Sequence, residues 1–556
     1  MTPALSISAG PPLDAEPGLG ALTLPGFLRE VTSAYPAREA LVFHDDLSGE
    51  VVRWSYADLW ERAVEVARAL RGSGLGQGAR VGVLMTNRPE WLAAVFGTAL
   101  AGGVAVTLST FSTPSELDHL LKVSGVSFLL FERRVQKTDF AAVLTELEPG
   151  IAGGGELRST RFPFLRRLAV VGDAAPGVET WAEFLARGGD VPSALVDATA
   201  ESVKPSDTAV VFFSSGTTSK PKGVLSAHRG VTVQMWRFRR MFGFGPQDTV
   251  RCWTANGFFW SGNFGQALGA TLAAGGSLVL QRVFDADAAL ALMARERVTF
   301  PVAWPHQWAH LASARGWDDT DLSALVFVDR ATPAARHRTV TADWSEPGRA
   351  YGNTETFTIS TCYPANTPDE VHGGSSGLPL PGVTVKIVDP LTGAVVPRGE
   401  HGEICVKGPT LMLGYLGTPL DETLDADGFF PTGDGGRLDA EGRLFWEGRL
   451  TDLIKTGGAN VSPLEVDEAL AAHPSVKVAK TVGVPHDTLG EVVVACVVPQ
   501  GPEPDTDELR AHLRTRLAAY KVPRHILYFT EDDLTLTGSN KIKSSDLRAL
   551  AAARLG

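Results

Sequence analysis

Cysteine is scarce in this chain, with four residues among 556. They lie far apart, and no two of them share a CxxC or CxxxC spacing: Cys252, Cys362, Cys405 and Cys496. Zinc sites and redox dithiols need such paired spacings, and small secreted domains held by disulfides are much denser in cysteine. The scarcity therefore argues against a disulfide framework or a zinc site, and it favours reduced thiols in a cytoplasmic protein.

Positive charge is also in short supply. Lys and Arg number 51 against 63 Asp and Glu, which gives a formal net charge of −12. Nucleic acids and anionic membranes both favour an excess of Lys and Arg in the proteins that bind them. We therefore expect no nucleic-acid partner, and an anionic ligand must bind at a local cluster of positive groups.

Neither a targeting segment nor a membrane span is expected. The first 20 residues, MTPALSISAGPPLDAEPGLG, contain two acids and no Lys or Arg, so we expect a flexible tail and no secretory signal. The most apolar stretch, residues 92–108, is interrupted by Gly97, Gly102 and Gly103. Because a membrane helix needs about 20 apolar residues, this stretch is expected to be a buried helix that leads into a strand.

Short apolar runs alternate with longer helical patterns through much of the chain. The expected strands are residues 80–85, 104–108, 126–131, 209–213, 277–280, 298–302 and 325–328. The expected helices include residues 88–101 and residues 113–124, the latter with Pro114 near its start. Such alternation predicts βαβ units, a mostly parallel sheet and hence an α/β fold.

After Gly382 the sequence becomes β-rich, with strands expected at 383–389, 403–407 and 443–447, and a compact α/β stretch of about a hundred residues follows Gly448. A chain of 556 residues is too long for one ordinary core, so at least two domains are expected.

The most informative segment is VVFFSSGTTSKPKG, residues 210–223. Its first four residues predict a buried strand, and the loop after it gathers hydroxyls, a glycine and two lysines: Ser214, Ser215, Gly216, Thr217, Thr218, Ser219, Lys220 and Lys222. Backbone N–H groups, hydroxyls and ammonium groups that converge after a strand suit a polyphosphate. It is not a Walker A loop, because Pro221 stands where that motif needs a Gly. The alternative is an ordinary surface loop of turn residues.

Two further turns offer groups that suit a nucleotide. In YGNTET, residues 351–356, Glu355 is a candidate ligand for Mg²⁺ on a phosphate, and Tyr351 is a candidate to stack on a base. In TGDGG, residues 432–436, Asp434 is a candidate acceptor for both hydroxyls of a ribose. The alternative in each case is a tight turn whose polar side chain bonds its own backbone.

The C-terminal stretch holds two more candidate segments. GRLTDLIKTGGANVSPLEVDEAL, residues 448–470, offers Arg449 as a second ribose ligand, and it predicts a helix with Ser462 as N-cap and Pro463 as its first residue. TLTGSNKIK, residues 535–543, presents Lys541 on a turn. Taken alone, residues 448–451 are typical of a linker, and Lys541 is typical of a solvated charge.

Together and in this order, these segments resemble the adenylate-forming superfamily of acyl-CoA synthetases, nonribosomal adenylation domains and luciferases. The resemblance extends from about Trp54 to Arg548 and includes GEICVKGPTLMLGYL (402–416) and VGVPHDTLGE (482–491). It implies a large N-terminal domain, residues 1–450, that binds ATP and the acyl group, made of parallel α/β sheets and a small β-rich subdomain. It also implies a mobile α+β C-terminal lid, residues 451–556, that carries Lys541.

The resemblance also implies a reaction and a set of site residues. A carboxylate and ATP would give an acyl-adenylate and pyrophosphate, and the thiol of coenzyme A would then form the thioester and release AMP. Lys541 would bridge the carboxylate and the α-phosphate, Glu355 would bind Mg²⁺, and Lys455 would lie near the pantetheine tunnel at Gly457 and Gly458. The implied nucleotide-binding residues are Ser214, Ser215, Gly216, Thr217, Thr218, Lys222, Asp329, Arg330, Tyr351, Gly352, Thr354, Asp434 and Arg449.

Several positions depart from the pattern of the resembling proteins. Ser219 replaces the usual Gly of the phosphate loop, Asp329 and Arg330 replace a Gly-Gly pair at the adenine, and Asn540 replaces the Gly before Lys541. Thr451 stands at the hinge, where Asp or Lys is common. Because Ser219, Asp329 and Arg330 are placed at ATP, weakened adenylation is an alternative to a complete ligase.

The acyl pocket is expected to be aromatic. Trp260, in NGFFWSGNFG (256–265), stands where many relatives have His and is a candidate gate, with ordinary core packing as the alternative. The candidate pocket residues are Asn256, Phe259, Trp260 and Trp304. This composition favours an apolar acid, cyclic or bulky, over an amino acid.

Three functions follow as hypotheses. The first is an acyl-CoA ligase that uses ATP, Mg²⁺ and coenzyme A on a small carboxylic acid. The second is a ligase that thioesterifies an acyl-adenylate supplied from elsewhere. The third is a stand-alone domain that loads a carrier-protein phosphopantetheine, although the chain contains no carrier domain. A homodimer is an open alternative to a monomer.

Overall fold

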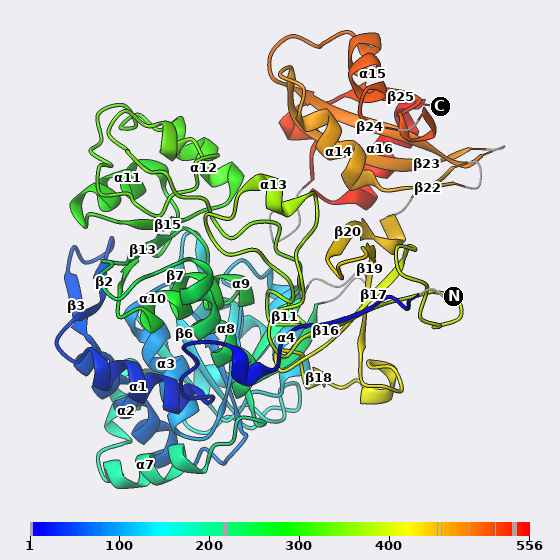
Figure 1. Cartoon of the computed structure of the whole chain (residues 1–556). Coiled ribbons are helices and arrows are strands. Elements are labelled where there is room, and N and C mark those ends of the chain that lie inside the picture. The colour runs from blue at the N-terminus through cyan, green and yellow to red at the C-terminus, as the bar shows by residue number, and fades with distance from the viewer. Residues whose placement is uncertain are drawn as a thin grey trace. The chain divides into compact units, whose positions relative to one another are not determined.

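The computed structural model describes residues 4–214, 221–452, 454–456, 459–486, 489–517, 519–535 and 542–555. The chain divides into two compact units (Figure 1). The larger comprises Ala9–Thr384 and Val406–Phe430, and the smaller comprises Met1–Ser8, Val385–Cys405 and Pro431–Gly556. This division groups the β-rich segment with the C-terminal stretch, while the domain boundary between residues 450 and 451 stays a prediction.

An eight-stranded sheet forms the centre of the larger unit. Its strand order is β10-β9-β6-β4-β5-β11-β12-β18. The strands from β9 to β11 pair in parallel, as predicted, and β12 and β18 add antiparallel strands. The bounds are β4 Arg80–Leu84, β5 Val104–Thr107, β6 Phe128–Glu132, β9 Arg167–Val171, β10 Glu179–Thr180, β11 Thr208–Ser214, β12 Lys222–Ala227 and β18 Gly414–Tyr415.

A second sheet of the larger unit has the order β15-β13-β14-β2-β3. Its bounds are β2 Glu39–His44, β3 Val51–Ser55, β13 Arg251–Thr254, β14 Ser277–Leu280 and β15 Phe300–Val302. The strand predicted at residues 325–328 is wrong. The N–H groups of Val326 and Phe327 both donate to the carbonyl of Thr299, so the segment reaches the edge of the sheet but builds no ladder.

Two helices of the larger unit begin at capping boxes that the sequence supplies. Ser55 and Thr113 each form a reciprocal capping box with the acid three residues later, at the starts of α2 and α4. The bounds are α1 Leu24–Ala34, α2 Tyr56–Gly72, α3 Pro89–Leu100, α4 Pro114–Ser124, α5 Phe140–Leu147, α6 Trp181–Ala186, α7 Ser193–Ser202, α8 His228–Met241, α9 Ser261–Asn263, α10 Ala270–Ala273, α11 Ala286–Arg295, α12 Pro305–Ala312 and α13 Asp369–His372. Two short strands, β7 Arg134–Val135 and β8 Thr138–Asp139, form a hairpin before α5.

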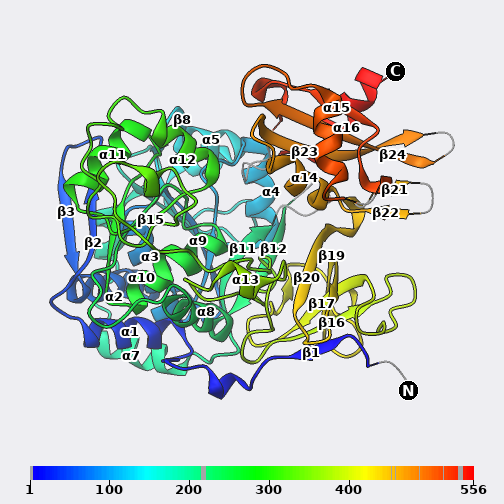
Figure 2. The same ribbon diagram turned by 45° about the horizontal axis from the view of Figure 1, so that its top comes forward.

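Burial follows the sequence pattern closely in this unit. Every residue of α3 except Glu90 is buried, and the helix leads into the buried strand β5, as predicted for residues 92–108. Apolar side chains of α4 and α5 share one core cluster with strands of the large sheet. Helix α8 packs against β11 and β12 (Figures 1 and 2). Among the described residues, no helix has both the length and the apolar character to cross a membrane.

The smaller unit contains two sheets. The first has the order β1-β16-β17-β19-β20, and the second has the order β22-β21-β24-β23 with β25 parallel to β24. The strand bounds are β1 Ile7–Ala9, β16 Thr384–Val388, β17 Gly402–Lys407, β19 Phe430–Leu438, β20 Leu444–Arg449, β21 Ile454–Thr456, β22 Ala459–Val461, β23 Val476–His486, β24 Gly490–Pro499 and β25 His525–Tyr528. The helices are α14 Pro463–Ala471, α15 Thr506–Arg514 and α16 Ser544–Leu555.

All four cysteines are free and buried. Burial raises the pKa of the thiols of Cys252, Cys362 and Cys496 to about 12. Because the thiolate is the reactive form of cysteine, these three thiols stay protonated and pack as small apolar groups.

The N-terminal segment is not the flexible tail that its composition predicts. Glu16 is 4% exposed. Its carboxylate accepts a hydrogen bond from Nε of the fully buried Arg237 at 2.9 Å and also contacts the guanidinium of Arg240. A guanidinium that has left water requires a counter-charge, so the arginines of α8 fix this segment against the core.

We predict that Glu16→Ala strongly destabilises the larger unit. The substitution leaves Arg237 buried without its carboxylate, and breaking a buried ion pair costs about 3–5 kcal/mol. Urea unfolding, followed by fluorescence, measures the change. Asp14→Ala removes an exposed acid two residues away and is the matched control. Equal destabilisation by the two substitutions would contradict the anchoring role of Glu16.

Candidate active site

The predicted phosphate loop joins two paired strands. Strand β11 ends at Ser214 and β12 begins at Lys222, and these two residues lie opposite each other in the antiparallel ladder. Ser215, Gly216, Thr217 and Thr218 of the loop itself lie outside the described residues, as do Ser219 and Lys220. The described ends of the loop therefore bring a hydroxyl and an ammonium group to the same edge of the large sheet.

Glu355 lies at the centre of a small polar cluster that includes Ser214, at one described end of this loop. Its Oε1 accepts hydrogen bonds from the hydroxyls of Ser214, at 3.1 Å, and Tyr415, at 2.8 Å. The Nζ of Lys222 lies 5.0 Å from the centre of the Tyr415 ring. Three predicted residues, Ser214, Lys222 and Glu355, are thus brought together around Tyr415.

Sequence reasoning did not single out Tyr415. It lies within the GYL sequence at the end of residues 402–416, on the short strand β18, where it pairs with Val224 of β12. A tyrosine in a two-residue strand gives no local signal of a partner 60 residues away. Its role becomes visible only once β18 is seen beside β12.

The loop that carries Glu355 is tightly folded. Tyr351 is buried and pairs with Thr361, and the carbonyl of Thr354 accepts from the N–H of Phe357. A Cβ at Gly352 would lie 1.8 Å from the carbonyl oxygen of Thr358, so only glycine fits there. Phe357 and Thr358 have φ of 45° and 83°, a conformation that side chains disfavour and that is common at functional sites.

Asp329 and Arg330 differ in how their side chains are used. The carboxylate of Asp329 accepts from the N–H groups of Ala331, at 2.7 Å, and Glu346, at 2.8 Å. The side chain of Arg330 is exposed, while its N–H donates to the carbonyl of Trp344. Asp329 thus holds the backbone of its own loop, and contact of either residue with adenine stays a prediction.

A chain of amide groups connects two of the predicted acyl-pocket residues. The N–H of Trp304 donates to Oε1 of Gln307 at 2.8 Å, and Nε2 of Gln307 donates to Oδ1 of Asn256 at 3.0 Å. Phe259 is buried, and its ring centre lies 5.4 Å from that of the half-buried Trp260. Sequence reasoning missed Gln307, because it sits on one turn of α12 without any motif.

Asp434 and Arg449, the predicted ribose ligands, lie opposite each other on β19 and β20 of the smaller unit. Nε of Arg449 is 3.1 Å from Oδ1 of Asp434, and Nη1 donates to the carbonyl of Thr432 at 2.7 Å. Asp434 is 4% exposed. The structure therefore brings this predicted pair together and gives the arginine a fixed orientation.

The other predicted residues of the smaller unit are only partly described. Lys455 lies in β21 with an exposed side chain, and its N–H donates to Glu491 at 2.9 Å. Gly457, Gly458 and Lys541 lie outside the described residues. Helix α14 begins at Pro463 as predicted, but the hydroxyl of Ser462 donates to the carbonyl of Glu447 and forms no cap bond with the helix.

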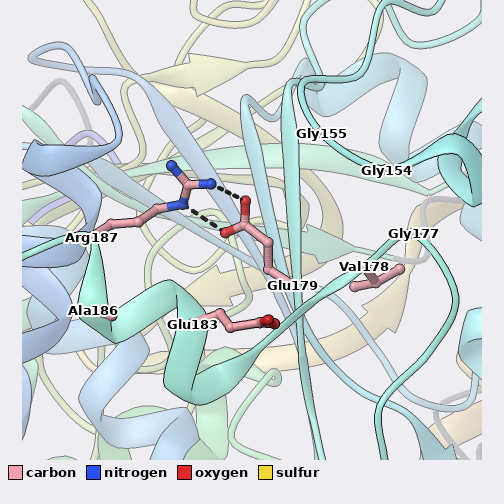
Figure 3. A pocket seen from close by; sticks show the side chains of 8 residues that line it. All are labelled: Gly154, Gly155, Gly177, Val178, Glu179, Glu183, Ala186 and Arg187. Carbon is pink, nitrogen blue, oxygen red and sulfur yellow. Dashed lines mark hydrogen bonds and ion pairs between the residues drawn. The ribbon is translucent and has the colours of Figure 1, made fainter.

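A surface hollow of about 490 Å³ lies elsewhere in the larger unit, between Gly154–Gly155 and the segment 177–187 (Figure 3). Glu179 and Arg187 face each other across part of it, and Nε of Arg187 donates to Glu179 at 2.8 Å. None of the predicted site residues lines this hollow. Its main charged groups are already paired, so it is not a candidate for the active site.

Comparison with known proteins agrees with these observations. A model of the AMP-binding enzyme family matches residues 28–416, and a model of the AMP-binding enzyme C-terminal domain matches residues 465–541. The chain belongs to the AMP-binding enzyme family. The predicted superfamily and the α/β fold with its additional C-terminal domain are thereby confirmed.

Individual relatives match this AMP-binding enzyme over most of their length. Feruloyl-CoA synthase of Amycolatopsis sp is 32% identical over 503 residues, covering 89% of this chain and 93% of the relative. Medium-chain acyl-CoA ligase ACSF2, mitochondrial, of Danio rerio is 28% identical, covering 100% and 92%. The structure of ATP-bound MatB from Rhodopseudomonas palustris has a TM-score of 0.73 and 25% identity, covering 96% of this chain and 100% of that one.

The donor set at Glu355 fits a magnesium ion that arrives with a nucleotide. In the described part of the chain, no three His, Cys, Asp or Glu side chains cluster in a way that would hold a metal. Mg²⁺ in nucleotide sites is commonly held by one or two carboxylates together with phosphate oxygens and water. A single carboxylate next to Ser214, at one end of the predicted phosphate loop, fits that arrangement.

We predict that Tyr415→Phe impairs adenylate formation by this AMP-binding enzyme about tenfold or more. The change removes one of two hydroxyl donors from Glu355 but keeps the ring beside Lys222, and a hydrogen bond to a charged group contributes about 1.5–3 kcal/mol. Pyrophosphate release measures the effect. Tyr363→Phe, which removes a hydroxyl that bonds Ser375, is the control, and an equal loss in both variants would rule out a specific role for Tyr415.

Proposed function

We propose that the protein is an ATP-dependent acyl-CoA ligase that activates a carboxylic acid as an acyl-adenylate and transfers the acyl group to coenzyme A. The observation that carries the proposal is the cluster of Ser214, Lys222 and Glu355 at the ends of the phosphate loop. Family membership and the names of the relatives support it.

In the first step, a carboxylate oxygen bonds to the α-phosphorus while the bond to pyrophosphate breaks. Negative charge builds on the phosphate oxygens, so positive groups and N–H donors fixed in advance accelerate the step. Lys222 supplies one such charge, and Lys541 supplies another in the proposed mechanism. Mg²⁺ bound to Glu355 would neutralise further phosphate charge and orient the leaving group.

In the second step, the sulfur of coenzyme A bonds to the acyl carbon and AMP leaves with the electron pair, while the thiol proton passes to solvent. Lys455, Gly457 and Gly458 are the proposed neighbours of the pantetheine arm. Asp434 and Arg449 are the proposed holders of the ribose through both steps, because a buried carboxylate fixed by a guanidinium is a ready acceptor for two hydroxyls.

For the substrate we infer an apolar acid, cyclic or bulky. Phe259, Trp260 and Trp304 would offer it aromatic surface, and one donor of Gln307 is bound to Oδ1 of Asn256. The buried Nδ2 of Asn256 has no hydrogen-bond partner among the described residues. The named acids of feruloyl-CoA synthase and of the medium-chain ligase are also largely apolar, which supports the inference. We also propose that the protein is cytoplasmic. It would act as a monomer or homodimer, without a carrier-protein partner.

The decisive experiment separates the two half-reactions. Enzyme, ATP, Mg²⁺ and a panel of acids are incubated, and pyrophosphate and acyl-CoA are followed separately. We expect both products with at least one acid.

We also expect Lys541→Ala to abolish pyrophosphate release while sparing thioester formation from a supplied acyl-adenylate, since this lysine acts only while charge builds on the α-phosphate.

Each alternative gives a different result in the same assay. Thioester formation from a supplied adenylate without pyrophosphate release from ATP would favour the adenylation-impaired ligase. Release of pyrophosphate with transfer only to a phosphopantetheinyl carrier protein would favour the carrier-loading domain. Equal loss of both half-reactions in Lys541→Ala would refute the proposed division of labour.

We predict that Trp260→Ala shifts substrate preference toward longer or bulkier acids. If Trp260 lines the acyl pocket, its removal opens volume there. If it serves only the core, the substitution instead costs about 3–5 kcal/mol of stability. Trp317→Ala, at another partly buried tryptophan, is the control, and a lowered melting temperature with an unchanged ranking of acids would exclude the gate.

A further inference from the structure

Gln234 of α8 makes a set of hydrogen bonds that the catalytic scheme does not account for. Its side chain is fully buried. Nε2 donates to the carbonyl of Phe357 at 2.8 Å and to the carbonyl of Ile359 at 2.7 Å, while Oε1 accepts from Nη1 of Arg237 at 3.3 Å. Only this orientation of the amide is possible, because a guanidinium has donors only and a carbonyl has acceptors only.

The two carbonyls belong to the strained part of the loop that carries Glu355. Phe357 and Thr358 adopt positive φ, and the hydroxyl of Thr358 is buried without a hydrogen-bond partner in the described structure. A β-branched residue in this conformation persists only where its surroundings hold it. Gln234 bonds the residues on both sides of Thr358, so its amide fixes the backbone there.

Gln234 is itself held by Arg237, which is paired with Glu16. Arg237 donates from Nη1 to Gln234, from Nε to Glu16 and from Nη2 to the carbonyl of Pro381, at 3.3, 2.9 and 2.8 Å. Each of its three nitrogens therefore has an acceptor, and the guanidinium is 0% exposed. A buried polar network in which each nitrogen of the cation has an acceptor restricts the motion of its members. Rigidity at Glu16 and Arg237 is thus transmitted through one amide to the loop around Glu355.

We propose that Gln234 is a positioning residue for adenylate formation. It holds the strained turn at Phe357 and Thr358 and thereby sets where the carboxylate of Glu355, two residues earlier, meets the magnesium ion and phosphates. The proposal rests on the proposed function, because it assigns Glu355 to the nucleotide. It adds a residue that touches neither substrate nor metal.

The test uses Gln234→Met, which keeps the length of the side chain but removes both donors. The control is Thr232→Val on the same helix, a buried residue whose hydroxyl bonds only carbonyls of its own helix. Three quantities are measured in the full-length protein: amide hydrogen exchange of residues 351–361 without nucleotide, affinity for Mn²⁺ with a non-hydrolysable ATP analogue by paramagnetic resonance, and the rates of both half-reactions.

For Gln234→Met we expect exchange in residues 351–361 to rise at least tenfold and Mn²⁺ affinity to fall about tenfold. Pyrophosphate release should fall by a similar factor. Thioester formation from saturating acyl-adenylate should stay within about twofold of wild type. Values that match those of Thr232→Val in all three measurements would overturn the proposal, and so would an equal loss in both half-reactions.

Thr358→Gly provides a second route in case Gln234→Met does not fold. Glycine relieves the strain at this positive φ, so the protein keeps or gains thermal stability. Gln234 still holds the turn in this variant, so Mn²⁺ affinity and pyrophosphate release should stay near wild type. In the double variant Gln234→Met/Thr358→Gly the turn folds without strain but is no longer held, because glycine also adopts other conformations, so both quantities should fall. Unchanged Mn²⁺ affinity in the double variant would overturn the proposal. A wild type that releases no pyrophosphate with any acid would count against the proposed function instead, and hydrogen exchange would still judge the role of Gln234.

Discussion

A buried guanidinium holds together the segments that meet at the loop of Glu355. Arg237 lies in the middle of α8 with no exposure to water, and such a cation is tolerated only when acceptors surround it. Two of the acceptors come from distant parts of the chain, the carboxylate of Glu16 and the carbonyl of Pro381, and the third is the amide of Gln234 on the same helix. One charge therefore connects the N-terminal segment, helix α8 and the loop of Glu355 in a single polar network.

The residues that suit phosphates and metal and the residues that suit a ribose belong to different units of the chain. Ser214, Lys222 and Glu355, whose groups suit phosphates and metal, belong to the larger unit, whereas Asp434 and Arg449, which suit a ribose, belong to the smaller one. The lysines proposed for the separate half-reactions, Lys455 and Lys541, are also in the smaller unit.

Local patterns in the sequence predicted local structure well. Apolar runs located β4, β5, β11 and β14, and Thr113 with Pro114 located the start of α4, because strands and helix caps depend on neighbouring residues. Motifs also brought forward Glu355 and the pair of Asp434 with Arg449.

The sequence could not show that Glu16 is buried, since its partner lies 221 residues away and its local composition is that of a tail. Sequence patterns missed three more residues for the same reason: Tyr415, Gln234 and Gln307. Each of them makes its important contact with a residue far away in the sequence. The strand predicted at residues 325–328 was wrong for the opposite reason. The segment has a β-like composition, but its N–H groups find only one carbonyl, that of Thr299, at the sheet edge.

The concealment of all four thiols has a practical side. Colorimetric thiol reagents react with thiolates that solvent can reach, and the folded chain presents none to them. In a mixture that contains this protein and coenzyme A, the colour would therefore come from the coenzyme alone. Its disappearance during turnover can be read continuously at high enzyme concentration, without blocking groups or cysteine-free variants, and a late rise in colour would signal unfolding of the protein itself.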